Sequence, residues 1–219
     1  MVETGGSIFI ALPLVVMLLS LLPVCTLFVR KVAVSAILNV LRILCLFVFL
    51  QYLTLYFIQP GSPALYTSCK LVEFTLVFYL FKLMIPSGQG KDIMNMFLVS
   101  FLSVVITIYS LKGIMAFPGI MTVVQAAILT LLAFVVLFQV ISNRHIVLIN
   151  EPAFWVAGGL LCYFGMVVFM EAIAGYQSGL SQQIQQQKSI IIMFADIMRM
   201  IIFVVAVSVA GKQPIDNRQ

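Results

Sequence analysis

The chain has 219 residues, of which 63% are hydrophobic and only 9% are charged. So few charges cannot cover the surface of a soluble domain of this length, and the chain is therefore expected to be solvated by lipid. Its length suits several membrane spans of about 20 residues joined by short loops, and no soluble catalytic or nucleic-acid-binding domain is expected beside them. The net charge of +5 comes from bases scattered at the ends of apolar runs, so nucleic acid is not expected as a partner.

Apolar runs separated by short polar segments predict an all-α integral membrane protein, a single seven-transmembrane-helix bundle over residues 1–219. The first run is too long for the apolar region of a cleaved signal peptide, and the bases Arg30 and Lys31 follow it. A proline- and glycine-containing turn separates the second run from the third. In chain order, the predicted spans are about residues 7–28, 37–58, 64–85, 93–111, 120–141, 153–172 and 189–210.

The basic residues predict how this bundle is oriented. With seven spans, one side of the membrane would carry Arg30, Lys31, Arg42, Lys82, Lys91, Arg144, Lys212 and Arg218. Only Lys112 and Lys188 would lie on the other side. Because the cytoplasmic side of a membrane protein carries the excess of bases, the N-terminus is expected outside and the C-terminus inside. The expected location is the bacterial inner (plasma) membrane, as a multi-pass protein whose first partner is the lipid bilayer.

Two pairs of charges lie inside the third and seventh predicted spans. Lys70 and Glu73 share one helical face, and so do Asp196 and Arg199, because each pair is three residues apart. Both helices would run from outside to inside, so opposite charges would meet at matching depths. We therefore expect a cluster with Lys70 bonded to Asp196 and Glu73 bonded to Arg199. Such a cluster is either structural, holding two helices in register, or a ligand, proton or switch site.

The fourth predicted span carries a stripe of hydroxyl groups at spacings of three, four and three residues. Small polar residues let membrane helices approach one another and bond across their interface. The stripe is therefore expected to pack against another helix, with a polar pathway as the alternative. Its members are Ser100, Ser103, Thr107 and Ser110.

No pattern in the chain is typical of catalysis. There is no Ser/His/Asp or Cys/His arrangement, no glycine-rich phosphate loop and no carboxylate-rich metal site. The four cysteines all fall within predicted spans, where a buried cysteine behaves as a small hydrophobe. The protein is therefore expected to be no enzyme and to hold neither a metal nor a cofactor.

Residues 65–74 and 150–155 resemble segments of a family of small seven-span membrane proteins of Bacteroidota. Its members are often encoded beside sensor histidine kinases and have no established function. The resemblance covers most of the chain in layout, although Lys70 and Arg199 are not part of the family pattern. It implies a role in signalling, and it highlights Glu73, Phe74, Asn150, Phe154 and Trp155.

These observations lead to two functional hypotheses. The first is a non-enzymatic sensory or accessory protein of the inner membrane, acting through a partner such as a membrane sensor kinase or through a homo-oligomer. The alternative is a small secondary transporter, because spans one to three and five to seven share an orientation, giving a 3+1+3 helix layout. Neither the ligand nor the partner can be read from the chain.

Overall fold

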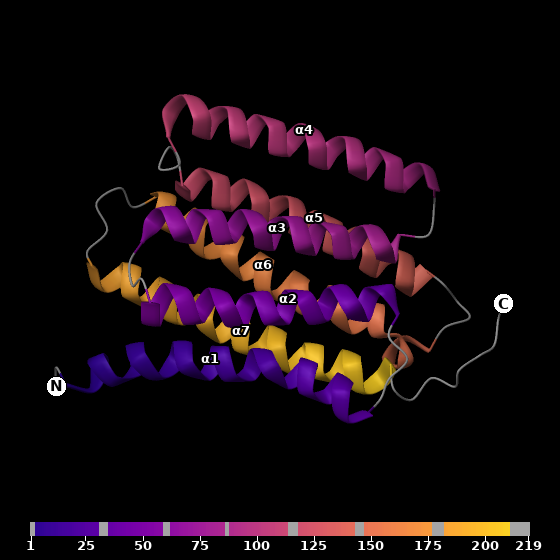
Figure 1. Ribbon diagram of the computed structural model, residues 1–219, viewed down its shortest axis with the longest axis horizontal. Helices are drawn as coiled ribbons and strands as arrows, with labels where there is room; N and C mark the ends of the chain where they lie inside the picture. Colours follow the sequence, from indigo (N-terminus) through magenta and orange to yellow (C-terminus); the bar gives the residue numbers. More distant parts are fainter. Residues whose placement is uncertain are drawn as a thin grey trace.

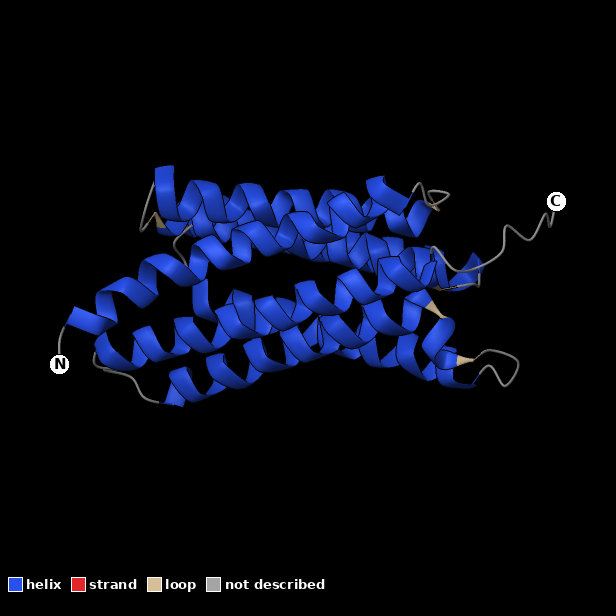
Figure 2. Cartoon of the chain, turned by 90° about the horizontal axis from the view of Figure 1, so that it is seen from below, coloured by secondary structure: helices blue, strands red, loops and turns tan. Residues whose placement is uncertain are grey.

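The computed structural model describes residues 3–30, 35–58, 62–85, 88–113, 118–142, 147–176 and 182–210. This part of the chain is built from helices joined by short loops (Figures 1 and 2). Seven of its helices are long and apolar enough to cross a membrane, which makes the chain a multi-pass membrane protein. The α-helices are α1 (Glu3–Arg30), α2 (Ala36–Leu53), α3 (Pro63–Met84), α4 (Gly88–Lys112), α5 (Pro118–Ser142), α6 (Pro152–Tyr176) and α7 (Gln182–Ala210).

Local sequence signals set several helix ends. The Ser35 hydroxyl accepts a hydrogen bond from the Leu38 N–H at the start of α2, and Ser62 caps α3 in the same way, just before Pro63. A π-helical turn, Thr54–Ile58, continues α2. Gly113, with a φ of +84°, follows the end of α4, where the left-handed conformation favours glycine.

Each predicted span has its helix, although α1, α4 and α6 extend four or five residues beyond the prediction at one end, and α7 differs most. There the helix begins at Gln182 and not at about residue 189, because the glutamine-rich segment continues the helix beyond the apolar run.

Six helices form a ring in the order α1, α2, α3, α5, α6, α7, and α7 packs back against α1. The fourth helix, α4, lies outside this ring, at the edge of the bundle (Figure 1). Aromatic rings pack α4 against α3. The ring centres of Phe101 and Phe74 are 4.8 Å apart, and those of Phe97 and Phe78 are 6.0 Å apart. An aromatic contact between α3 and α4 therefore attaches the outer helix to the ring.

The hydroxyl stripe of α4 does not have the packing role within the chain that its sequence predicts. All four of its residues are exposed, on a helix that packs through its aromatic side instead. Two of the hydroxyls donate to carbonyls of their own helix, Ser103 to Val99 and Thr107 to Ser103. Because such bonds satisfy a hydroxyl without any neighbour, the stripe tolerates an exposed position. The exposed members are Ser100, Ser103, Thr107 and Ser110.

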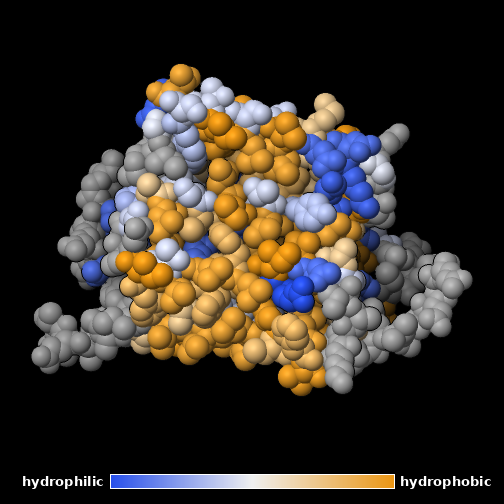
Figure 3. Space-filling model, viewed as in Figure 1, coloured by the Kyte–Doolittle hydropathy of each residue, from blue (hydrophilic) through white to orange (hydrophobic). Residues whose placement is uncertain are grey.

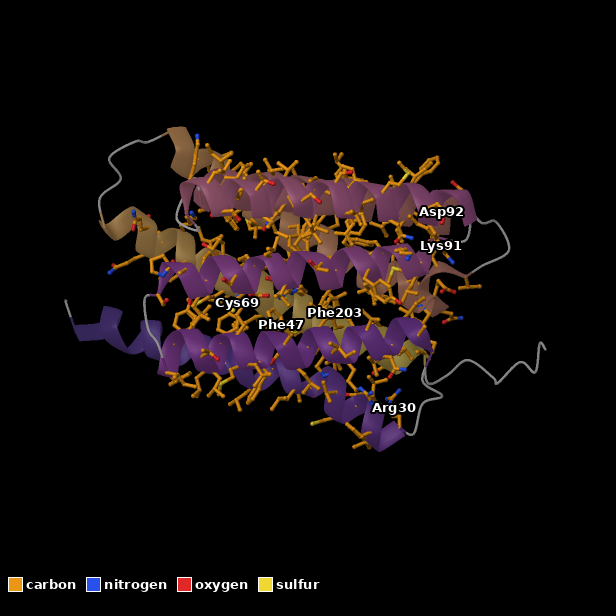
Figure 4. The ribbon with its side chains drawn as sticks, turned by 45° about the horizontal axis from the view of Figure 1, so that its top comes forward. Arg30, Phe47, Cys69, Lys91, Asp92 and Phe203 are labelled. Carbon is orange, nitrogen blue, oxygen red and sulfur yellow. The ribbon has the colours of Figure 1, made fainter. Side chains whose placement is uncertain are left out.

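The two ends of the bundle differ in packing. Toward the end where α3 finishes and α2 begins, the interior is filled by side chains with no exposed surface, including Leu44, Phe81 and Phe203. At this end the Arg30 guanidinium donates to the Ser208 carbonyl over 2.9 Å, joining α1 to α7. Arg30 and Lys91 lie toward this same end, while Phe203 lies between the helices (Figure 4). The visible surface between the ends is mostly hydrophobic (Figure 3), as contact with lipid requires.

Gly159 marks a close approach of α6 to α7. A Cβ atom added there would lie 3.1 Å from Cγ2 of Ile202. The neighbouring Gly158 has nothing within 4 Å of its own Cβ position. Substitutions at these two adjacent glycines therefore distinguish the effect of crowding between α6 and α7 from the effect of losing a glycine.

We expect Gly159→Val to lower the free energy of unfolding in detergent by about 1–3 kcal/mol, because the larger side chain forces α6 away from α7. Gly158→Val is the matched control and should leave stability nearly unchanged. Thermal unfolding followed by circular dichroism measures both variants. Equal losses in the two would contradict the close α6–α7 contact.

Candidate functional site

Glu73 of α3 lies at the centre of a buried charge cluster. Its Oε1 accepts a hydrogen bond of 2.7 Å from Nη1 of Arg199, which belongs to α7. Its Oε2 accepts one of 2.6 Å from Nζ of Lys70, one turn earlier on α3. One carboxylate therefore neutralises bases on two helices, and the predicted pairing of Glu73 with Arg199 is confirmed.

Asp196 is bonded within α7 and to α2. Its Oδ1 forms an ion pair of 2.5 Å with Nη2 of Arg199 and has no hydrogen-bond partner within the described part of the chain. Its Oδ2 accepts a 2.7 Å hydrogen bond from the Tyr52 hydroxyl. Asp196 thereby connects α7 to α2 through Tyr52, a residue that the charge pattern of the sequence does not indicate.

Tyr163 brings α6 into the same cluster. Its hydroxyl accepts a 3.0 Å hydrogen bond from Nζ of Lys70. The guanidinium carbon of Arg199 lies 3.9 Å from the centre of its ring, which is a close cation–π contact. We refer to Tyr52, Lys70, Glu73, Tyr163, Asp196 and Arg199 together as the charge network.

The predicted ion pair between Lys70 and Asp196 is wrong. Lys70 bonds to Glu73 of its own helix, and Asp196 pairs with Arg199 of its own helix. The physical reason is the shape of the guanidinium, whose planar fork can contact two carboxylates at once. Arg199 thus bridges Glu73 and Asp196, and Lys70 is left to Glu73 and Tyr163.

The charge network is neutral and almost entirely enclosed. Its two acids and two bases cancel, and the side chains of Glu73, Asp196 and Arg199 are at most 2% exposed. Nε of Arg199 is buried without a hydrogen-bond partner. Lys70 differs from the others, because its side chain is 15% exposed. Lys70 is therefore the most exposed charged member of the network.

A cavity of about 720 Å³ explains the exposure of Lys70. It lies among α2, α3, α5, α6 and α7, and Tyr52, Lys70, Tyr163 and Asp196 form its floor. At its mouth, Nζ of Lys188 forms a 2.7 Å ion pair with Glu171, which joins α7 to α6. The cavity thus runs from one end of the bundle down to the charge network, and the tightly packed interior lies beyond it.

Several polar side chains that line the cavity make no hydrogen bond within the described part of the chain, among them those of Gln51, Tyr56 and Tyr66. Gln51 is a buried residue, 6% exposed, and it lines the cavity. The Tyr66 ring lies 5.7 Å from Nζ of Lys70, as expected for a residue one turn away on the same face. A second space of about 20 Å³ beside Glu73 and Gln125 is large enough for one water molecule.

The residues highlighted by the family resemblance fall at two separate places. Glu73 belongs to the charge network, and Phe74 is buried beside it against α4. The other three, Asn150, Phe154 and Trp155, lie at the start of α6, at the packed end of the bundle. There Nε1 of Trp155 donates to the Ile149 carbonyl over 2.9 Å. They shape a helix start and do not reach the cavity.

Among the described residues, no group of histidine, cysteine, aspartate and glutamate side chains is arranged to hold a metal ion. Comparison with known proteins adds no family, because no family model, curated protein or solved structure matches the chain. The resemblance to the Bacteroidota family therefore stays a prediction. The site is thus defined by its own geometry, a cavity that lies beside the charge network toward one end of the bundle.

The bridge between α3 and α7 leads to a quantitative prediction. Glu73→Gln should lower the free energy of unfolding by about 3–5 kcal/mol, since it leaves buried bases without their acid. The double variant Glu73→Gln, Arg199→Gln should lose less than the sum of the two single variants, because Lys70 and Asp196 still balance. Thermal unfolding of all four proteins in detergent measures the coupling.

The rim pair Glu171 and Lys188 is the matched control for this cycle. Both side chains are partly exposed, at 11% and 24%, so water screens their charges. Its double-mutant cycle should give a coupling below about 1 kcal/mol. Strict additivity at Glu73 and Arg199 would contradict the bridge.

The bond between Tyr52 and Asp196 gives a separate prediction. Tyr52→Phe keeps the ring but leaves Oδ2 of Asp196 without its donor, so unfolding should become easier by about 1–3 kcal/mol. Tyr79→Phe is the control, since Tyr79 is 44% exposed. If both substitutions shift the unfolding temperature equally, the Tyr52 hydroxyl does not stabilise the network.

Proposed function

We propose that the chain is a non-enzymatic sensory or accessory protein of the bacterial inner membrane that binds a small molecule and acts through a partner. The observation that carries this proposal is the cavity that lies beside the charge network toward one end of the bundle, while closely packed side chains fill the interior toward the other end. A cavity of this kind admits a ligand, while the packed interior beyond it blocks passage. The proposal places the N-terminus outside, so that the cavity faces the cell exterior.

The proposed response is a change in the bonds that hold four helices together. Lys70 is shared between Glu73 and Tyr163, and these two residues also contact Arg199. A ligand that engages Lys70 weakens one of its bonds and shifts the balance between α3, α6 and α7. Such a ligand changes the helix arrangement only by the difference in its affinity for the two arrangements.

The partner is proposed on a different basis. The family resemblance favours a membrane sensor kinase as the protein that reads the change, with a homo-oligomer of this chain as the second choice. A signal carried by helix movement needs only a neighbouring membrane segment, so neither choice requires catalysis by this chain.

The alternative, a small secondary transporter, is supported by the order of the helices. The ring is divided into α1–α2–α3 and α5–α6–α7, and α4 lies outside it. Each half meets the other through its first and third helices, as two parallel repeats related by an axis along the membrane normal would do. Under this hypothesis the packed end would open to the cytoplasm during transport.

One-sided access separates the two functions. In a background without the native cysteines, Met193→Cys places a thiol on the cavity wall and Ala206→Cys places one in the packed interior. A membrane-impermeant maleimide added to cells should label Met193→Cys from outside and leave Ala206→Cys unlabelled. The same reagent added outside inverted vesicles, whose outer surface is the cytoplasmic face, should label neither position in a sensor.

Ile201→Cys is the control on the same helix, since Ile201 is an exposed residue of the lipid-facing surface and should not react from either side. Labelling of Ala206→Cys from the cytoplasmic side would favour the transporter. Labelling of Met193→Cys from the cytoplasmic side alone would reverse the proposed orientation. Labelled fractions are read from a mass shift on a gel.

A further inference from the structure

We infer that the cavity binds a small organic molecule of no net charge, which presents a hydrogen-bond acceptor oxygen to Lys70 and a flat ring to the tyrosines. This inference rests on the proposed function and names its ligand class. Carbonyl and amide oxygens are acceptors of this kind.

The accessible charged group on the cavity floor is a donor. An ammonium group has three N–H donors, and the hydrogen bonds of Lys70 to Glu73 and Tyr163 use two of them. The third remains for a ligand oxygen. The carboxylate of Asp196 is less accessible, because its two oxygens are already occupied by Arg199 and Tyr52.

Unpaired polar groups surround the same position. Gln51 is 6% exposed as a residue and lines the cavity, and its amide makes no hydrogen bond within the described part of the chain. An amide carries both donors and an acceptor, so a ligand in the cavity can bond to it. The hydroxyls of Tyr56 and Tyr66 add two adaptable donors and acceptors to the same wall.

Charge balance argues against an ionic ligand. The charge network is already neutral, and the rim pair Glu171 and Lys188 is neutral as well. An anion would have to draw Lys70 away from Glu73, and a cation would have to displace Arg199 or Tyr52 from Asp196. Either ligand would leave one uncompensated charge in a low-dielectric site, which is unfavourable.

The walls fit an apolar or aromatic body. The rings of Tyr52 and Tyr56 are stacked, with centres 5.4 Å apart and an angle of 9° between their planes. The cavity volume of about 720 Å³ lies within the range of about 300–1,000 Å³ that is typical of small-molecule sites. The apolar lining residues are Leu55, Ile120, Val123, Val124, Ile192 and Met193.

Three probes that share one ring and differ in charge test this inference: benzamide, benzoate and benzylammonium. Each is titrated into the full chain in nanodiscs, with empty nanodiscs subtracted, and its Kd is measured by saturation-transfer NMR. Benzamide should bind at least about tenfold more tightly than either ion, the difference expected for one buried unpaired charge of modest cost.

Variants connect the binding to the cavity. Lys70→Met should weaken benzamide binding about tenfold, the equivalent of one hydrogen bond. Gln51→Leu should weaken benzamide binding to a similar degree. Because Gln51 lies outside the charge network, this variant tests the site even if Lys70→Met does not fold. Lys82→Met is the matched control, because Lys82 lies on the same helix at the packed end.

The outcomes are distinguishable. Benzamide binding that survives both Lys70→Met and Gln51→Leu overturns the inference, and so does wild-type protein that binds none of the three probes. Benzoate or benzylammonium binding more tightly than benzamide, with loss on Gln51→Leu, overturns the ligand class but leaves the cavity as a binding site. The proposed function fails separately, through the labelling of Ala206→Cys from the cytoplasmic side.

Discussion

A membrane interior tolerates a charge only when another charge or a polar group compensates it, and Arg199 is where this constraint acts most strongly. Its guanidinium reaches Glu73 on α3 and Asp196 on α7, and it lies over the ring of Tyr163 on α6. The helix ring therefore contains a single connected polar centre instead of several independent ion pairs. Because each member compensates another, no helix of this group can shift without affecting the rest.

The polar centre also divides the bundle into two unequal halves. On one side the interior is closed by aliphatic and aromatic side chains such as Leu44 and Phe81. On the other side, tyrosines and Gln51 line the cavity of about 720 Å³. Open space and close packing thus lie toward opposite ends of the same helices, and the charge network lies between them.

The sequence predicts much of this arrangement, and the exceptions have physical causes. Apolar run length and the positions of bases predict the helices, and matching depths predict the Glu73–Arg199 pair. Tyr52 and Tyr163 were missed because a tyrosine within an apolar run reads as a hydrophobe, although its buried hydroxyl needs a partner. The cavity depends on the distances between five helices, and no pattern of neighbouring residues in the sequence predicts those distances. The packing face of α4 was misjudged since hydroxyls can bond to their own helix, as Ser103 does.

The position of α4 outside the ring has a consequence for chain polarity. This helix contributes little to the interior, yet its single crossing makes α5, α6 and α7 run in the same directions as α1, α2 and α3. Without that crossing, α7 would run antiparallel to α3. Arg199 would then lie level with Lys70, and Asp196 with Glu73, so that like charges would face each other in hydrocarbon. The outer helix α4 thus sets the direction of α7 relative to α3. The attraction between opposite charges at the centre of the bundle depends on this direction, although α4 makes few contacts with the ring.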